Sequence, residues 1–334
     1  MKLALLGTGK IVREALLALE HVPRITKVCI YARPHSESKA RELSEKYQIP
    51  EVYTDYDLLL QNADIDYVYV GLVNSAHYSY AKKALEAGKN VIMEKPFTST
   101  LAEAEEICAL AQQKGLYVIE AVTSLHSAVT DRIRELIPKI APVRLVQSNY
   151  SQYSSRYDRY LKGEVEPCFD PALSGGSLYD IDIYNLNLTA DLFGEPEEVY
   201  YYANKGFNGI DISGVMVMRY PGFVATAAGA KDSDSPCFFQ IQGEKGWIRM
   251  PEKPSDIRSV EYCVDGQTGR FCPEELPHRM VEEFRDFARI AEEKDTDRVV
   301  QGLKTSAAVL RMAEKGRKGA GIHFGVDDET EGEA

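Results

Sequence analysis

Two patterns of apolar and polar positions follow one another along the chain. Up to about residue 121, short apolar runs alternate with amphipathic segments of helical period. A parallel sheet with crossover helices requires this alternation, so the pattern predicts a doubly wound α/β fold. The predicted strands are Leu3–Leu6, Lys27–Tyr31, Tyr67–Val70, Val91–Met93 and Tyr117–Ala121. The predicted helices are Ile11–Leu19, Ser36–Tyr47, Ala76–Ala87 and Leu101–Lys114.

The pattern changes after Ala121. A helix is predicted from Ser127 to Ile137, ending at Pro138, and a helix-like run ends at Phe193. Strand patterns then come in direct succession, which favours an antiparallel sheet. The strands predicted in this half are Val143–Tyr150, Val199–Ala203, Gly214–Tyr220, Val224–Ala230, Phe238–Gln242 and Gly246–Met250, and the helices Pro277–Glu293 and Gln301–Lys315 follow them. The 334 residues fit two domains, and we place them at 1–122 and 123–334.

Composition narrows the classes of partner. The formal net charge of −12 argues against a nucleic acid or an anionic membrane, because both favour lysine and arginine clusters. Five acids lie between Asp327 and Glu333, and we expect them to form a solvated tail. No apolar stretch approaches the roughly 20 residues that span a bilayer, and the amino terminus does not have the pattern of a signal peptide. The six cysteines contain no Cys-x-x-Cys, so we expect a reduced, cytoplasmic protein without a metal site.

A glycine turn follows the first predicted strand. Gly7-Thr8-Gly9 leads through Lys10 and Ile11 into the first predicted helix. Glycines at this place let backbone approach a pyrophosphate at the helix amino terminus. A glycine pair alone is a weak signal, and Val12 replaces the third glycine of the usual pattern. The position in the first strand-to-helix turn nevertheless favours a dinucleotide site.

The end of the second predicted strand bears on the choice of cofactor. NAD is usually held there by an acid that accepts from the ribose hydroxyls. This chain has Ala32 and Arg33 instead, so NADP is preferred and NAD remains an alternative. The competing interpretation is that Arg33 is an ordinary surface arginine.

Two further segments carry candidate chemistry. Lys95 follows the apolar run that ends at Glu94, and a lysine at the carboxyl end of such a strand points into the crevice where these sheets bind ligands. In the run from Gly175 to Asn185, Asp180 and Tyr184 are four residues apart and share a helix face. They are either a packing and capping device or, with Lys95, an acid-base set.

These motifs together resemble the glucose-fructose oxidoreductase / inositol dehydrogenase / MocA family (Gfo/Idh/MocA). The resemblance rests on Gly7-Thr8-Gly9, Asn74-x-x-His77, Ala87-Gly88-Lys89-Asn90-Val91, Glu94-Lys95-Pro96 and the Gly-Gly-Ser-Leu-x-Asp-x-x-x-Tyr run, in order along essentially the whole chain. It implies an amino-terminal Rossmann domain and a carboxyl-terminal α/β domain with an open, mostly antiparallel sheet for substrate binding and oligomerisation. It also implies NAD(P)-dependent oxidoreduction of sugars, polyols, diols or related carbonyl compounds. The cofactor residues so implied are Gly7, Thr8, Gly9, Lys10, Ile11, Ala32, Arg33, Leu72, Asn74, His77, Glu94, Lys95 and Pro96, with the Lys95–Pro96 bond cis.

Two positions distinguish branches of the family. Many relatives have histidine where this chain has Tyr184, and the tyrosine form is similar to the glucose-fructose oxidoreductase and dimeric dihydrodiol dehydrogenase branch, as is the Glu120-Ala121 pair. Asp182 stands where relatives have glycine, and this extra carboxylate leaves the substrate open. Candidate substrate-side residues are His126, Tyr153, Arg156 and Tyr157, for which surface packing is the alternative; His77 has the alternative of a purely structural contact.

The combined interpretation is hydride transfer between nicotinamide C4 and a carbonyl or secondary alcohol carbon. Tyr184 exchanges the proton, Lys95 favours its ionised form, and Asp180 orients Lys95 or binds a neighbouring hydroxyl. The rival hypothesis is a non-catalytic NADP-binding regulator, against which the retention of all three residues speaks; action on an amine or a bound aglycone stays open. Apolar residues on both faces of the second sheet, such as Val215 and Met216, predict a homodimer or larger assembly.

Overall fold

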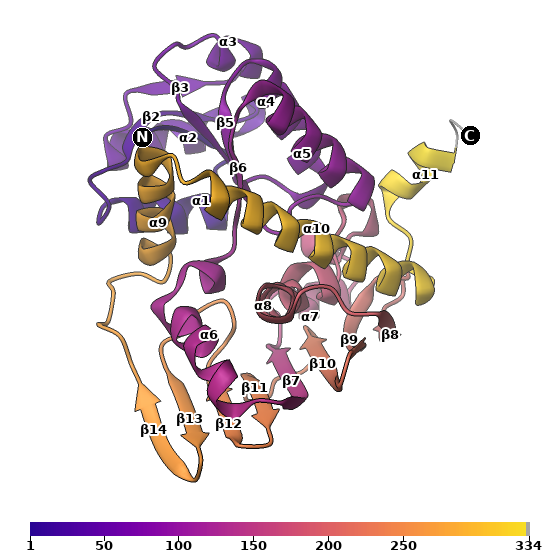
Figure 1. Ribbon diagram of the computed structural model, residues 1–334. Helices are drawn as coiled ribbons and strands as arrows, with labels where there is room; N and C mark the ends of the chain where they lie inside the picture. The colour runs from indigo at the N-terminus through magenta and orange to yellow at the C-terminus, as the bar shows by residue number, and fades with distance from the viewer. Residues whose placement is uncertain (332–334) are drawn as a thin grey trace. The chain divides into compact units, whose positions relative to one another are not determined.

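The computed structural model describes residues 1–331, with side chains through Asp328. The chain folds as two compact units, each described by itself below. The first unit contains residues 1–121 and 276–306, and the second contains residues 122–275 and the chain from 307 onward. Figure 1 shows the course of the chain through both units.

The first unit is built on a six-stranded parallel sheet. Its strands are β1 (Lys2–Leu6), β2 (Thr26–Tyr31), β3 (Glu51–Tyr53), β4 (Tyr67–Val70), β5 (Asn90–Glu94) and β6 (Val118–Ala121). The order β3-β2-β1-β4-β5-β6 is that of a Rossmann fold, so the predicted doubly wound sheet is confirmed. The register pairs Leu6 with both Tyr31 and Val70, which brings the carboxyl ends of β1, β2 and β4 to one edge.

Helices cover both faces of this sheet (Figure 1). They are α1 (Lys10–Leu19), α2 (Glu37–Tyr47), α3 (Tyr56–Leu60), α4 (His77–Glu86), α5 (Leu101–Lys114) and α9 (Val281–Glu293), with 3₁₀ turns at Pro34–Ser36 and Asn74–Ala76. Capping residues mark the ends of some of these helices. The clearest is the reciprocal capping box of Thr100 and Glu103 at the start of α5, with Gly115 ending that helix in the left-handed conformation.

Helix α9 lies far along the chain but belongs to the first unit. Its buried face, with Phe284 and Phe287, joins the core formed by β1 and α1. The structure thus groups residues 276–306 with the first unit, whereas the boundary expected at 122/123 assigns them to the second domain. The physical reason is that an amphipathic helix is stabilised by whichever apolar surface covers it, and residues of α1 and of the six-stranded sheet, such as Tyr69, cover α9.

The second unit contains an eight-stranded sheet. Its strands are β7 (Val143–Ser151), β8 (Glu198–Lys205), β9 (Asp211–Tyr220), β10 (Phe223–Ala230), β11 (Phe238–Gly243), β12 (Gly246–Met250), β13 (Val260–Val264) and β14 (Gln267–Phe271). The order is β14-β13-β12-β11-β7-β10-β9-β8, and every pair is antiparallel except β7 with β10. The mostly antiparallel open sheet is therefore confirmed.

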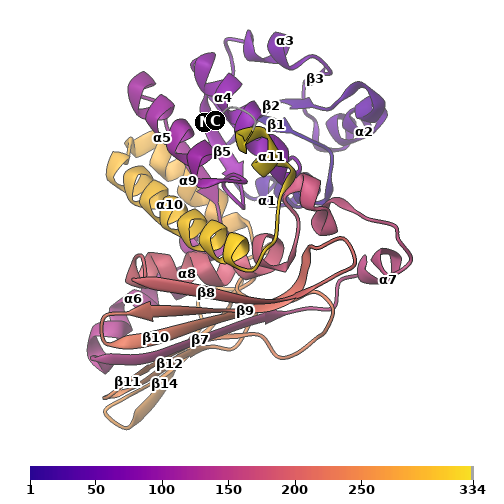
Figure 2. The ribbon, with the colours of Figure 1, turned by 90° about the vertical axis from the view of Figure 1, so that its right-hand side faces the viewer.

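Three helical segments of the second unit lie on one face of this sheet, while the described helices leave the other face open (Figure 2). They are α6 (Ala128–Ile140), α8 (Ile183–Phe193) and the later part of α10 (Thr296–Gly319). The second unit also contains α7 (Tyr157–Tyr160), α11 (Gly325–Glu331) and short 3₁₀ turns at Thr123–His126, Pro167–Phe169 and Pro171–Leu173. Helix α6 continues past Pro138 to Ile140, so the predicted end at Pro138 is wrong. A proline in the last turn removes only one late hydrogen bond, and the helix tolerates it.

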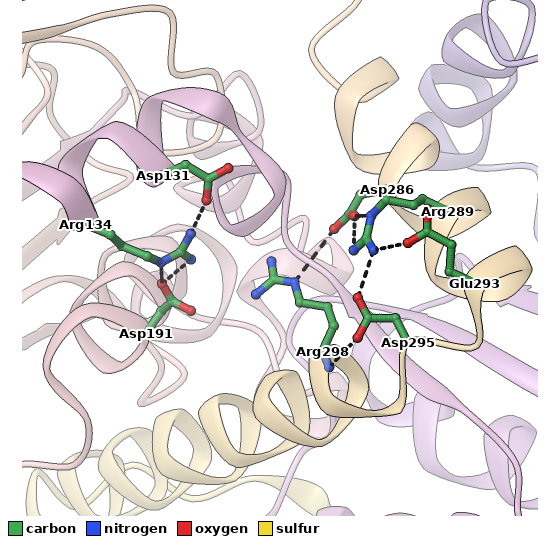
Figure 3. Close-up of polar contacts among 8 residues, drawn as sticks. All are labelled: Asp131, Arg134, Asp191, Asp286, Arg289, Glu293, Asp295 and Arg298. Carbon is green, nitrogen blue, oxygen red and sulfur yellow. Dashed lines mark hydrogen bonds and ion pairs between the residues drawn. The ribbon is translucent and has the colours of Figure 1, made fainter.

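Ion pairs join neighbouring helices within each unit (Figure 3). In the second unit, Arg134 of α6 contacts Asp131 on its own helix and Asp191 of α8, the latter at 2.5 Å. In the first unit, Arg289 of α9 lies 2.8 Å from each of three carboxylates, those of Asp286, Glu293 and Asp295. Asp295 also accepts from the Arg298 backbone, so one cluster links the end of α9 to the first turn of α10.

The acidic segment after Gly325 differs from the solvated tail that the sequence predicted. Residues 325–331 form α11, and Asp327 is buried against Arg317 of α10, whose Nη1 lies 2.5 Å from Oδ2. The Arg317 guanidinium also lies 4.1 Å from the ring centre of Phe324. The prediction is wrong for Asp327, because charge density alone does not show that a buried cation lies within reach, whereas Asp328 is exposed as predicted. The side chains of Glu329, Glu331 and Glu333 lie outside the part of the chain that the structure describes.

Candidate active site

The glycine turn occupies the switch point between β1 and β4. Gly7 has φ +109°, and a Cβ added there would lie 2.6 Å from the carbonyl oxygen of Gly71, the residue after β4. Gly9 is the N-cap of α1, has no side-chain cap, and has open space around its missing Cβ. The first amides of α1 therefore have no capping side chain, and the open space at Gly9 lets a pyrophosphate approach them.

Val12, which replaces the third glycine of the usual pattern, is accommodated by Gly71. Val12 is fully buried, and a Cβ on Gly71 would lie 2.6 Å from its Cγ2. The close packing between α1 and the sheet is thus kept, with the small residue placed on β4's side of the contact. The departure from the glycine pattern leaves the turn intact.

Arg33 lies just beyond the carboxyl end of β2. It is exposed and precedes the 3₁₀ turn that begins at Pro34. Ala32 is buried and donates its backbone amide to Tyr53 of β3 at 3.0 Å, which fixes the start of this loop. Arg33 therefore stands at the edge where the adenosine ribose binds in such sheets.

His77 joins two loops at the carboxyl edge of the first sheet. The side chain is fully buried, with Nδ1 2.8 Å from the Pro96 carbonyl oxygen and Nε2 3.3 Å from that of Leu72. Burial lowers the pKa of His77, which favours the neutral ring, and a neutral imidazole has one N–H to donate to these carbonyl oxygens. The histidine thereby positions the loop of Leu72 and Asn74 beside the cis Lys95–Pro96 bond.

Glu94 is the last residue of β5 and Lys95 directly follows it, and the two side chains differ in burial. Glu94 is buried and accepts a hydrogen bond of 2.5 Å from the Tyr69 hydroxyl, whereas Lys95 is only partly buried. Burial raises the pKa of Glu94, and burial together with the Glu94 charge raises the pKa of Glu283 on α9 well above its usual value. Neither carboxylate oxygen of Glu283 has a hydrogen-bond partner among the described residues. The two buried acids therefore oppose each other's ionisation, a feature that the sequence did not reveal.

Glu120 supports the segment after Pro96 from the neighbouring strand. It accepts from the Ser306 hydroxyl at 2.6 Å and from the Phe97 backbone amide. Burial raises the pKa of Glu120 to about 7. The Lys95–Pro96–Phe97 segment is thus held through the Pro96 carbonyl by His77 and through the Phe97 amide by Glu120.

Asp180 and Tyr184 lie in the second unit, at the junction of a π-helical turn, η6 (Leu178–Asp182), with α8. Tyr184 is 6% exposed, and its ring centre lies 6.0 Å from that of Tyr150 on β7. The side chain of Asp180 is 31% exposed and lies 2.7 Å from Nζ of Lys231, a residue that the sequence did not single out. A π-helical turn often marks a functional site because it redirects side chains.

Asp182, the residue that departs from the family pattern, is fully buried against Gly229 of β10. A Cβ at Gly229 would lie 2.7 Å from Cβ of Asp182 and 3.1 Å from the Ser177 hydroxyl oxygen. Asp182 accepts from Asn185 Nδ2 at 2.7 Å, and burial raises its pKa to about 7. The extra carboxylate therefore points into the sheet rather than into solvent.

The four expected substrate-side residues are separated into two groups. Tyr153 and Tyr157 make an edge-to-face ring contact at 5.6 Å, and Arg156 between them lies 2.6 Å from Glu166. His126 ends the 3₁₀ turn Thr123–His126 and is partly buried. None of these contacts identifies a ligand. Among residues 1–328 no group of three or more His, Cys, Asp or Glu side chains is arranged to hold a metal ion.

Comparisons with known proteins agree with the fold and its glycine turn. A six-stranded doubly wound sheet with glycines at the switch point is typical of dinucleotide-binding proteins. Residues 1–122 match the family described as "Oxidoreductase family, NAD-binding Rossmann fold", and residues 131–249 match the "GFO/IDH/MocA C-terminal domain". The chain belongs to the Gfo/Idh/MocA family of oxidoreductases, as the resemblance implied.

Individual relatives cover nearly the whole chain. An uncharacterized oxidoreductase of Escherichia coli, YgjR, is 32% identical over 328 residues, covering 98% of both chains. The scyllo-inositol 2-dehydrogenase (NADP(+)) IolU of Bacillus subtilis is 28% identical over 327 residues, covering 98% of this chain and 99% of its own. The solved structure of the 3-ketoreductase KijD10 of Actinomadura kijaniata, in complex with NADP and TDP-benzene, matches with a TM-score of 0.79 at 20% identity. The match covers 96% of this chain and 97% of KijD10. In the described residues, no helix has the length and apolar character needed to cross a membrane.

Proposed function

We propose that this protein is an NADP-preferring dehydrogenase or reductase that interconverts a secondary alcohol and a carbonyl group on a sugar, inositol, other polyol or diol. The observation that carries the proposal is the glycine turn after β1, in which Gly7 packs closely against Gly71. This turn lies at the switch point where such sheets bind dinucleotides. The NADP-dependent scyllo-inositol dehydrogenase among the relatives supports the substrate class.

The residues of the first unit fit a nicotinamide dinucleotide. Backbone from Gly7 through Thr8, Gly9 and Lys10 to Ile11 binds the pyrophosphate at the start of α1, where Gly9 is an N-cap without a side-chain cap and the space around its missing Cβ is open. Arg33 pairs with a 2′-phosphate, which favours NADP, while NAD remains an accepted alternative. Ala32, Leu72, Asn74, His77, Glu94 and Pro96 shape the rest of the site, and the bound cofactor supplies the hydride chemistry.

Side chains of this protein accept and donate the proton of the substrate hydroxyl. In the oxidative direction the substrate hydroxyl loses its proton to Tyr184 as the carbinol hydride leaves, and the reverse steps protonate the new alkoxide. Lys95 favours the ionised phenol, and Asp180 binds a hydroxyl beside the reacting carbon. His126, Tyr153, Arg156 and Tyr157 are the proposed substrate-side residues.

The proposal extends to assembly and location. We propose a cytoplasmic homodimer or larger assembly formed through the open face of the eight-stranded sheet. Exposed apolar side chains follow one another across that face: Tyr200, Tyr202, Val215, Val224 and Trp247. Met216, Met218 and Ala225 of the same strands are buried on the other face, so the pattern gives each sheet face its own apolar surface.

A ligand panel tests the proposed function. Thermal shifts with NADPH and NADH, alone and with sugars, polyols, inositols and diols, identify ligands that bind the native state. Substrates that shift the unfolding temperature are then followed for nicotinamide reduction. Binding of NADPH without turnover of any panel member would contradict the enzyme and favour the regulator.

A further inference from the structure

Lys231 is a buried lysine at the end of β10. Its residue is 2% exposed, and its backbone bonds to Ile212 at 2.9 Å on one side and to Ser154 at 2.9 Å on the other. These two bonds fix where the side chain starts. A lysine is almost never fully buried unless its charge is compensated, so its contacts indicate its role.

Three groups surround the ammonium. Nζ lies 2.7 Å from Asp180 Oδ2, donates to the Cys168 carbonyl oxygen at 2.5 Å, and lies 4.1 Å from the ring centre of Phe169. A carboxylate, a carbonyl oxygen and an aromatic face all favour a positive charge. Asp211, which is buried nearby and accepts from Tyr201 and from the Leu178 amide, adds a second negative neighbour.

The pair is asymmetric in its exposure. The Lys231 side chain is 2% exposed and that of Asp180 is 31% exposed. The ammonium therefore lies behind the carboxylate, which presents part of its surface outward.

The backbone explains why the two residues meet. Gly229, two residues before Lys231, admits Asp182, which is two residues after Asp180. A Cβ at position 229 would lie 2.7 Å from Cβ of Asp182, so the close approach of η6 to β10 depends on that glycine. The same approach brings Asp180 within reach of Lys231.

We propose that Lys231 is a positioning residue that holds the Asp180 carboxylate directed at the hydroxyl next to the reacting carbon, so that the enzyme selects vicinal diols over simple alcohols. This inference rests on the proposed function. An ionised carboxylate accepts strongly from a hydroxyl, and a substrate without that hydroxyl leaves the carboxylate without the bond. Lys231 does not touch the reacting atoms; it acts through Asp180.

The test compares matched substrates in steady-state kinetics with NADP. The probe pairs are D-glucose with 2-deoxy-D-glucose, and 1,2-cyclohexanediol with cyclohexanol. We expect the wild type to prefer the diol member of a pair in kcat/KM. Lys231→Met should raise KM for that member about 10- to 100-fold, as loss of a hydrogen bond to a charged group does, and should change the deoxy member far less.

Three further variants separate positioning from folding. Asp180→Asn should lose the same selectivity, and the double variant Asp180→Asn/Lys231→Met should be no less selective than Asp180→Asn alone. The double variant also removes both charges, so it tests the inference even if Lys231→Met does not fold. Lys253→Met, at an exposed lysine of the same unit, serves as the control and should leave selectivity unchanged.

The outcomes are distinct. Equal losses on both members of a pair, or no loss, in Lys231→Met would show a structural ion pair and overturn the inference while leaving the proposed function in place. A wild type that does not discriminate the pairs would overturn it as well. No turnover by the wild type on the whole panel would remove the proposed function, and the inference with it. NADPH affinity should stay within about twofold in every variant, because these residues belong to the second unit.

Discussion

Glu120 Oε2 accepts a hydrogen bond from the Ser306 hydroxyl at 2.6 Å, which ties β6 to α10 within the first unit. Because burial raises the pKa of Glu120 to about 7, the native protein keeps this proton at pH values where the unfolded chain has released it. The contribution of Glu120 to the free energy of unfolding is then fully present below the unfolded pKa of about 4.3 and is lost as the pH rises through about 7.

Glu120→Gln should therefore flatten the pH dependence of stability. The difference in unfolding free energy between wild type and variant should change by up to about 3 kcal/mol between pH values of about 5 and 8. Urea unfolding across this range measures it. Glu86→Gln, at an exposed glutamate, is the control; an identical slope in wild type and Glu120→Gln would show that Glu120 titrates normally.

Lys95→Met and Tyr184→Phe should keep cofactor binding and lose turnover. We expect a decrease in kcat of about 10²- to 10⁴-fold for each, the range of a general acid-base contribution. The double variant should lose little more than the worse single one, because groups that act as a unit are not additive. Pre-steady-state turnover and NADPH titration measure the two quantities, and multiplicative losses would count against a shared relay.

Arg33→Ala should weaken NADPH binding and leave NADH binding nearly unchanged. The loss expected is about 10- to 100-fold, as for a hydrogen-bonded charge pair with a phosphate. Fluorescence titration with both cofactors gives the ratio. Arg41→Ala, at an exposed arginine of α2 that pairs with Glu37, is the control. Equal affinities for the two cofactors, unaffected by Arg33→Ala, would exclude a phosphate contact.

Arg317→Met should destabilise the second unit far more than loss of a surface ion pair. The guanidinium is 1% exposed and contacts Asp327 through two nitrogens, so its removal leaves a buried carboxylate and costs about 3 to 5 kcal/mol. Arg144→Met breaks an equally close pair with Glu244 at 2.6 Å, but both side chains are more than half exposed, and the cost should stay below about 1 kcal/mol. Denaturant midpoints of both variants decide the comparison.

Val215→Glu should dissociate the proposed homodimer. The residue is 40% exposed on the open face of the eight-stranded sheet, where a buried charge opposes association. Light scattering at micromolar concentration should report an assembly for wild type and a monomer for the variant. Asp256→Asn, outside the strands of that sheet, should not change the mass; a monomeric wild type would contradict the assembly.

The regular elements were predictable because buried strands and amphipathic helices have distinct periods. Three strands escaped prediction: β3, which spans only Glu51–Tyr53, and the paired strands β13 (Val260–Val264) and β14 (Gln267–Phe271), of which β14 is too polar to resemble a buried strand. Periodicity predicted the helix of α9 but not the surface that covers it. That choice depends on tertiary packing with α1, which no local pattern contains.

The candidate site was predictable where local chemistry is unusual. Lys95 was identified because it directly follows an apolar strand, and Asp180 because it shares a helix face with Tyr184. Lys231 also follows an apolar strand, yet it is preceded by small residues and followed by acids, which resembles an ordinary surface turn. Glu283 looked like one of two acids in the first turn of a helix, and only packing shows that it is buried beside Glu94.

The contact between Asp182 and Gly229 links two positions that are distant in the sequence. With aspartate at position 182, a Cβ at 229 would lie 2.7 Å from Cβ of Asp182, and glycine at 182 would remove this closest contact. Gly229→Ala in the present background brings a methyl group within 2.7 Å of Cβ of Asp182, so a side chain at position 229 requires η6 to move. The volumes at positions 182 and 229 are therefore coupled, and a chain that combines aspartate at 182 with a larger residue at 229 requires a shift of η6 away from β10.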